Sequence, residues 1–137
     1  MMKSYHGIQL DTYFKLKLKV MINTFLIAAI SIFLYTATGK ATYYGQHWTG
    51  RLTASGERFH ADSMTCAHKT LQFGTLLNVK DTKSDKEVIV KVNDRIPKSS
   101  PILIDLTYGV AKKMNMIRKG VLKVTITEVG TAKIYKK

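Results

Sequence analysis

Short stretches in which apolar and polar residues alternate recur along this chain, and such alternation is typical of strands with one buried face. The clearest stretch is residues 122–127, where leucine, valine and isoleucine alternate with lysine and threonine. Residues 87–93 follow the same rule, and Pro97, which cannot donate to a strand ladder, ends that run near residue 96. Further short strands are predicted at residues 41–44, 76–81 and 102–104.

Helical spacing is found once in the second half of the chain, in residues 107–115. There Val110, Ala111 and Met114 share one face, while two lysines point away. Asp105 or Thr107 is expected to cap the start of this helix. Many short strands with one short helix predict an all-β protein built as a small barrel.

A different pattern precedes the strands. Residues 20–35 form an uncharged apolar run that follows three lysines and leads into the small residues 36–39. This order predicts a secretory signal peptide, cleaved near residues 39–41. The alternative is an uncleaved membrane anchor through residues 20–35, a run close to the lower length limit for a spanning helix. No cysteine follows the run, so lipid modification is not expected.

The chain is therefore divided into three parts. Residues 1–40 are the basic and apolar signal peptide or anchor, residues 41–129 are the barrel, and residues 130–137 are a basic C-terminal tail. The formal net charge of +13 over 137 residues favours an anionic partner, such as nucleic acid, an anionic membrane surface or a cell-wall polymer. The single cysteine, Cys66, excludes an internal disulfide, and no ligand spacing indicates a metal or other cofactor.

Few polar residues stand where they can carry chemistry. Asp94 and Asp105 each close a β-branched run, and a carboxyl group in an apolar setting keeps its proton and can donate it to a leaving oxygen. Simpler readings stay open: a surface Asp94–Arg95 pair, an N-cap at Asp105, a core histidine at His68 and a solvated loop charge at Glu57.

Five sequence blocks, in this order, resemble the rare lipoprotein A (RlpA) family. They are Ala41-Thr42-Tyr43-Tyr44-Gly45, residues 53–59 with Ser-Gly-Glu, residues 67–75 with Ala-His-Lys-Thr, residues 90–95 with Asn-Asp-Arg, and residues 104–107 with Ile-Asp-Leu. The resemblance implies a six-stranded double-psi β-barrel. It also implies an endolytic transglycosylase that acts on peptidoglycan strands poor in stem peptides. Such enzymes cut between N-acetylmuramic acid and N-acetylglucosamine without water and leave a 1,6-anhydro end.

The resemblance also assigns residues. The positions tied to activity in that family fall on Asp94 and His68, with Glu57 as a third catalytic candidate, and Asp105 matches a functional aspartate of expansin-like barrels. We expect Asp94 to act as acid and then as base. His68 would orient it or bind the sugar, and Glu57 and Asp105 would position the glycan or tune Asp94. Arg95 is expected to contact the substrate.

Aromatic residues complete the expected site. Tyr43, Tyr44 and Trp48 are candidates for stacking on sugar rings, with at least one tyrosine buried in the barrel instead. Two positions depart from the family: Ile96 replaces a common glycine after Asn-Asp-Arg, and Cys66 replaces alanine. A β-branched residue resists positive φ, so the loop after Asp94 is expected to differ in shape.

The partners and location follow from the resemblance. Glycan strands of peptidoglycan are the expected partner, nucleic acid is not, and a monomer exported to the periplasm or cell envelope is expected. The main alternative function is an expansin-like protein that binds the wall without cleaving it. A basic nucleic-acid-binding barrel, suggested by charge alone, is the third reading.

Overall fold

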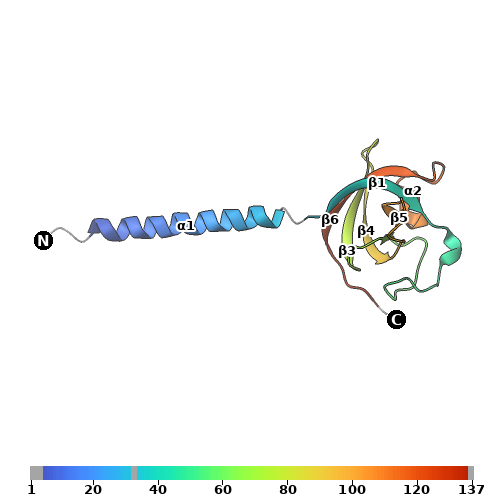
Figure 1. Cartoon of the computed structure of the whole chain (residues 1–137), viewed down its shortest axis with the longest axis horizontal. Helices are drawn as coiled ribbons and strands as arrows, with labels where there is room; N and C mark the ends of the chain where they lie inside the picture. Colours follow the sequence, from blue (N-terminus) through green and yellow to red (C-terminus); the bar gives the residue numbers. More distant parts are fainter. Residues whose placement is uncertain (1–4, 32–33, 136–137) are drawn as a thin grey trace. The chain divides into compact units, whose positions relative to one another are not determined.

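The computed structural model of the protein describes residues 5–31 and 34–135. The chain divides into two compact units, one ending at Leu34 and the other beginning at Tyr35. Figure 1 shows the elements of both units. The second unit carries every strand and the candidate site.

The first unit holds a single described helix, α1 (Tyr5–Ser31), in which Lys15 pairs with Asp11 at 2.7 Å. No helix within residues 5–31 and 34–135 is long and apolar enough to cross a membrane. The expected signal peptide or anchor, residues 1–40, contains α1, and residues 32 and 33 of its apolar run (20–35) lie outside the described residues, as do residues 1–4. Both readings of this segment stay predictions.

The second unit is a closed six-stranded barrel, which confirms the predicted fold class. Its strands follow the order β1-β5-β2-β4-β3-β6, and the pairs β1–β5 and β2–β4 are parallel. In chain order the elements are β1 (Thr36–Tyr43), the 3₁₀ turn η1 (Gln46–Trp48), β2 (Thr65–His68), β3 (Thr75–Asp81), β4 (Glu87–Asp94), β5 (Ile104–Leu106), α2 (Tyr108–Lys113) and β6 (Leu122–Thr131).

The alternating residues of the sequence fill the barrel as expected for strands with one buried face. In β6, Leu122, Val124 and Ile126 are buried while Lys123 between them is exposed. Cys66 lies fully buried in the same core, where burial raises the pKa of its thiol. The fully buried side chains of largest volume are Leu77, Ile104, Leu106, Met114, Met116 and Ile126.

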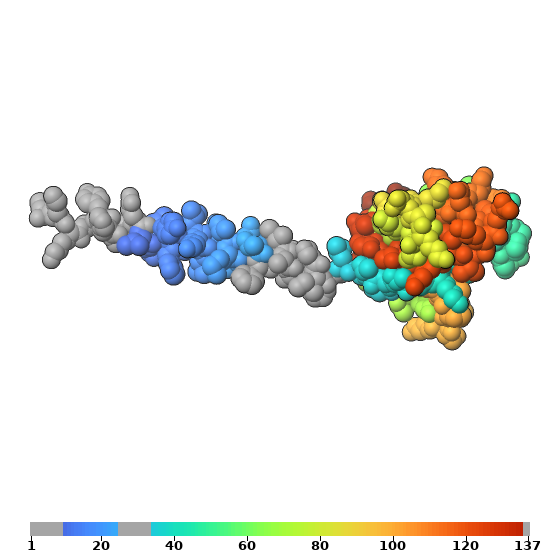
Figure 2. Space-filling model, turned by 90° about the horizontal axis from the view of Figure 1, so that it is seen from above, coloured from blue at the N-terminus to red at the C-terminus, as the bar shows by residue number. Residues whose placement is uncertain are grey.

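The N-terminal boundary of the barrel differs from the sequence prediction. β1 begins at Thr36, not at residue 41, and Thr36 to Ala41 pair with Thr127 to Leu122 of β6. Figure 2 shows β1 and β6 side by side on the barrel surface. The residues that resemble the exit of a signal peptide therefore form a barrel strand. Cleavage near residues 39–41 stays a prediction, and it would remove most of the β1–β6 ladder.

Candidate active site

A cavity of about 430 Å³ opens beside the ends of β4 and β5. Five of the seven predicted site residues line it: Tyr44, Trp48, Asp94, Arg95 and Asp105. The other two, His68 and Glu57, do not line this cavity. The structure thus brings together two aspartates, one arginine and two aromatic residues, and it places the remaining two candidates elsewhere.

Strand β2 explains why the two aspartates meet. Ala67 of β2 is the register partner of Asp94 on β4 and also of Asp105 on β5. Register partners point to the same face of a sheet. The side chain of Ala67, which also lines the cavity, is only a methyl group. It leaves space between the two carboxyl groups.

Asp94 is held by the main chain. The N–H groups of Ala54 and Arg95 both donate to its Oδ1 atom, at 3.0 and 2.8 Å. Ala54 belongs to the loop of the Ser-Gly-Glu block, so that loop reaches the end of β4. Within the described residues, the other carboxylate oxygen, Oδ2, accepts no hydrogen bond. It is the oxygen left for a ligand.

Asp105 has a different environment. Burial raises the pKa of its carboxyl group, the hydroxyl of Thr42 opposes this by donating to Oδ1 at 2.6 Å, and the charge of Asp94 raises the pKa again. The net result is a pKa above the ordinary value. Asp105 therefore holds its proton to a higher pH than a free aspartate does.

Tyr44 lines the same cavity as both carboxyl groups. Its ring packs on Phe59 with a centroid distance of 4.9 Å, and burial, with the charges of Asp94 and Asp105, raises the pKa of its hydroxyl group. That hydroxyl is buried and has no partner among the described residues. Tyr44 thus offers the cavity an unused hydrogen-bond donor, not a free ring face.

The other two aromatic candidates, Trp48 and Tyr43, occupy different places: Trp48 lines the cavity and Tyr43 does not. Trp48, 41% exposed at the cavity, carries the guanidinium of Arg51 over its ring at 4.5 Å. Tyr43 turns away from the cavity, because its hydroxyl donates to the carbonyl of Ile117. Tyr43 is partly buried against the barrel core.

The loop after Asp94 accommodates Ile96 at the cavity wall. Asn115 is the sole non-glycine residue with a positive φ in the described chain, so Ile96 keeps a backbone conformation that suits a β-branched side chain. Ile96, at a position where the family commonly has glycine, therefore adds an apolar side chain to the cavity wall, and its backbone is not strained by a positive φ.

His68 ends β2 and is 2% exposed. Its Nδ1 atom accepts the main-chain N–H groups of Thr70 and Leu71, at 3.3 and 3.1 Å. The simpler reading of His68 as a core histidine agrees with this burial, and the ring accepts hydrogen bonds from main-chain N–H groups. Burial lowers the pKa of the imidazole, and the charges of Arg95 and Lys69 lower it further.

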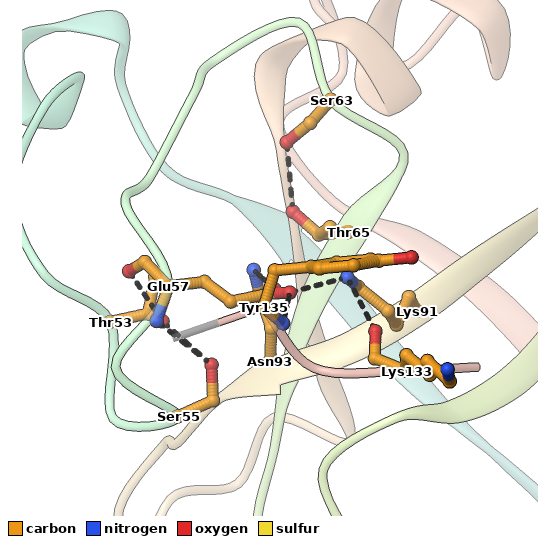
Figure 3. A network of polar contacts seen from close by, with 9 residues as sticks. All are labelled: Thr53, Ser55, Glu57, Ser63, Thr65, Lys91, Asn93, Lys133 and Tyr135. Carbon is orange, nitrogen blue, oxygen red and sulfur yellow. Dashed lines mark hydrogen bonds and ion pairs between the residues drawn. The ribbon is translucent and has the colours of Figure 1, made fainter. Parts of the chain in front are cut away.

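Glu57 is also buried, at 8% exposed, so the reading as a solvated loop charge is wrong. Its carboxylate pairs with Lys91 at 2.6 Å and accepts hydrogen bonds from the Asn93 amide and the Tyr135 N–H, both at 3.0 Å (Figure 3). Burial alone would raise its pKa, but these hydrogen bonds outweigh burial and lower it. Glu57 lines a separate cavity of about 300 Å³.

Glu57 still acts on the main cavity through its loop. Asn93, which binds the carboxylate, also accepts the N–H of Ser55 on its main-chain oxygen at 3.1 Å. These bonds fasten the 53–57 loop to the end of β4, next to the Ala54 N–H that holds Asp94. Glu57 is therefore a structural anchor for that loop.

Sequence reasoning missed Thr42, Arg51 and Lys91. Thr42 is identified only by the parallel register that pairs it with Asp105. The alternation of residues along β4 points Lys91 away from the buried valines beside it, and there its ammonium group pairs with Glu57. Among the described residues, no cluster of three or more His, Cys, Asp or Glu side chains is arranged to hold a metal ion.

Comparison with known proteins places this geometry in context. The family described as lytic transglycolase, a double-psi barrel group, matches residues 36–126. The probable endolytic peptidoglycan transglycosylase RlpA of Nostoc is 43% identical over 94 residues, covering 67% of this chain and 25% of the relative. The corresponding protein of Aquifex aeolicus is 50% identical over 84 residues, covering 61% of this chain and 37% of the relative.

A third relative, the endolytic peptidoglycan transglycosylase RlpA of Neisseria meningitidis, is 39% identical over 95 residues, covering 69% of this chain and 40% of the relative. The chain thus spans between 25% and 40% of the length of these relatives. The Streptomyces papain inhibitor (TM-score 0.58, 24% identity, 70% of this chain and 96% of that one) has a similar fold. So does an expansin of Clavibacter michiganensis (TM-score 0.55, 20% identity, 73% of this chain and 53% of that one).

Proposed function

The chain belongs to the lytic transglycolase family, and from this premise we propose that it is an endolytic lytic transglycosylase of peptidoglycan. Its substrate would be glycan strands poor in stem peptides, cut between N-acetylmuramic acid and N-acetylglucosamine. Peptidoglycan lies outside the cytoplasmic membrane, so the barrel would act on that side. The named activity of the relatives supports the reaction class.

One observation carries the proposal: two carboxyl groups with unlike environments face one cavity. Cleavage of a glycosidic bond needs a proton donor for the leaving oxygen and a negative group near the positive charge that develops at the anomeric carbon. Burial raises the pKa of Asp105, which suits it to carry the proton. Asp94, fixed by two main-chain N–H groups, is suited to face the developing charge.

The steps balance without water. Asp105 gives its proton to the oxygen of the leaving N-acetylglucosamine as the bond from that oxygen to the anomeric carbon breaks. The C6 hydroxyl of the muramic acid then attacks the anomeric carbon and returns its proton to the Asp105 carboxylate. The product is a 1,6-anhydro end, and Asp105 is protonated again. The sequence analysis gave the acid and base steps to Asp94; the environments of the two carboxyl groups favour Asp105 for them.

The cations and aromatic side chains of the cavity suit a sugar substrate. Trp48 presents a partly exposed ring at the cavity, as expected of a platform for a pyranose ring. The guanidinium of Arg95, also in the wall, offers donors for sugar hydroxyl or lactyl oxygens.

The test is digestion of purified glycan strands, stripped of stem peptides, by the full chain in ¹⁸O-labelled water. Products are read by mass spectrometry. Anhydro-ended fragments without the heavy oxygen are expected, and Asp94→Asn and Asp105→Asn should each lower the rate by about a hundredfold or more. Asp85→Asn, an exposed aspartate outside the cavity, is the matched control.

Two results would contradict the proposal. Fragments that carry the heavy oxygen would identify a hydrolase. Intact strands that bind the protein tightly would identify an expansin-like wall-binding protein.

A further inference from the structure

The Nδ1 atom of the His68 ring accepts hydrogen bonds from the turn that follows β2. This nitrogen is therefore not free to exchange a proton with a substrate. Two main-chain N–H groups, of Thr70 and Leu71, point at Nδ1. A nitrogen that accepts hydrogen bonds carries a lone pair, so the single ring proton of neutral imidazole is on Nε2. Protonation at Nδ1 would place a third N–H against these two.

The second ring nitrogen is no better placed for proton transfer. Nε2 is buried and has no hydrogen-bond partner among the described residues. The ring meets the Tyr35 ring edge to face, with a centroid distance of 5.8 Å. His68 does not line the cavity that holds Asp94 and Asp105. No described path carries a proton between this ring and a substrate there.

The turn fixed by His68 does reach that cavity, through Arg95. The guanidinium of Arg95 lies 3.8 Å above the Phe73 ring, and Phe73 belongs to the segment that follows the turn. One Arg95 nitrogen, Nη1, donates to the main-chain oxygen of His68 at 3.4 Å. Arg95 is therefore held from two sides by the segment that the His68 ring organises.

We propose that His68 is a positioning residue, which holds Arg95 in the cavity wall by fixing the turn at residues 68–71 through its Nδ1 atom. This inference rests on the proposed function for its catalytic readout. It assigns to His68 the orientation of the arginine beside Asp94, and no proton transfer.

Two substitutions separate this role from a catalytic one. The amide oxygen of asparagine takes the place of Nδ1, whereas that of glutamine takes the place of Nε2. His68→Asn should keep the two N–H bonds and hold kcat/KM for glycan cleavage within about threefold of wild type. His68→Gln should lose them and lower kcat/KM by about tenfold or more. The same substitution made in the Arg95→Ala background should cause no such further loss, because the side chain that His68 positions is already absent.

The pH dependence of kcat/KM is a second measurement that separates the two roles. His68→Asn should keep the wild-type profile of kcat/KM, because no imidazole proton is transferred. If His68 carried a proton, both variants would lose about a hundredfold or more and one limb of the profile would disappear. That result would overturn the proposal.

A spectroscopic measurement keeps the proposal testable if the glutamine variant does not fold. Imidazole ¹⁵N–¹H correlation spectra of the wild-type full chain should show His68 as the neutral Nε2–H tautomer across neutral pH. An Nδ1–H tautomer, or a protonated ring at neutral pH, would overturn it. If the wild-type protein releases no anhydro fragments, the proposed function fails, while the tautomer still decides the role of His68.

Discussion

Asp94 and Asp105 face one cavity from two strands that do not pair with each other, because β2 lies between β4 and β5. Burial raises the pKa of Asp105, and the charge of Asp94 adds to that rise. The two carboxyl groups therefore differ in how firmly they hold a proton. This difference has consequences for stability as well as for catalysis.

Replacing Asp105 with asparagine should stabilise the protein at neutral pH. A carboxyl group whose pKa is raised on folding binds its proton more tightly in the folded state. Its contribution to stability is therefore full below the ordinary aspartate pKa of about 3.9 and is lost as pH rises through the higher folded value. Urea unfolding of both proteins at a series of pH values measures the difference. An Asp105→Asn protein less stable than wild type at pH 7 would contradict this account.

Replacing Tyr44 with phenylalanine should separate stability from activity. The Tyr44 hydroxyl is buried without a partner, so its loss should leave stability unchanged or raise it by up to about 1 kcal/mol. If that hydroxyl donates to bound glycan, kcat/KM should fall about 5- to 30-fold. Thermal unfolding and glycan digestion are measured on the same preparation. A destabilised variant with full activity would show that the hydroxyl serves the fold alone.

The Glu57–Lys91 pair should contribute to stability, and to a pH-dependent extent. Glu57→Gln should lower the free energy of unfolding by about 1–3 kcal/mol at pH 7. Because the pKa of Glu57 is lowered on folding, this contribution is present above the ordinary glutamate value and is lost as pH falls through the folded one.

A double-mutant cycle tests whether the two side chains act together. Lys91→Met leaves the Glu57 carboxylate buried without its cation, so adding Glu57→Gln should recover part of the loss. Chemical unfolding of the single and double variants gives the coupling. Strictly additive losses would mean that the ion pair itself adds nothing.

A shortened chain should fold only if it keeps the whole of β1. A chain that begins at Tyr35 retains the six register pairs between β1 and β6, whereas one that begins at Ala41 retains the last of them. The first is expected to unfold cooperatively, and the second to lose cooperative unfolding or the fold itself. Circular dichroism during heating distinguishes them, and equal cooperativity in both would contradict the assigned role of β1.

The strands with clear alternation were predictable, and those without it were not. Residues 76–81, 87–93 and 122–127 were placed correctly, because apolar residues at alternate positions in each run pack into the core. β2 was missed because all four of its residues are buried, which leaves no alternation to read. The start of β1 was hidden by its small residues, which also suit the end of a signal peptide.

The same distinction applies to the site. Tyr44, Asp94, Arg95 and Asp105 were named from sequence blocks, and Trp48 was named as an aromatic candidate. The convergence of Asp94 and Asp105 nevertheless depends on the missed strand β2. The burial of Glu57 depends on Lys91 and Asn93, far along the chain and on a strand whose pairing is set only by the closed barrel. Contacts between segments far apart in the sequence cannot be predicted from the order of apolar and polar residues within one segment.

The ladder that closes the barrel joins its first strand to its last, with Thr36 opposite Thr127. During synthesis β1 is made long before its partner β6, so this ladder has no second strand until almost the whole barrel sequence has left the ribosome. Contacts this distant in sequence form slowly. The proposed function places the barrel outside the cytoplasmic membrane, and under that proposal late pairing of β1 with β6 would leave the barrel open until translocation is complete.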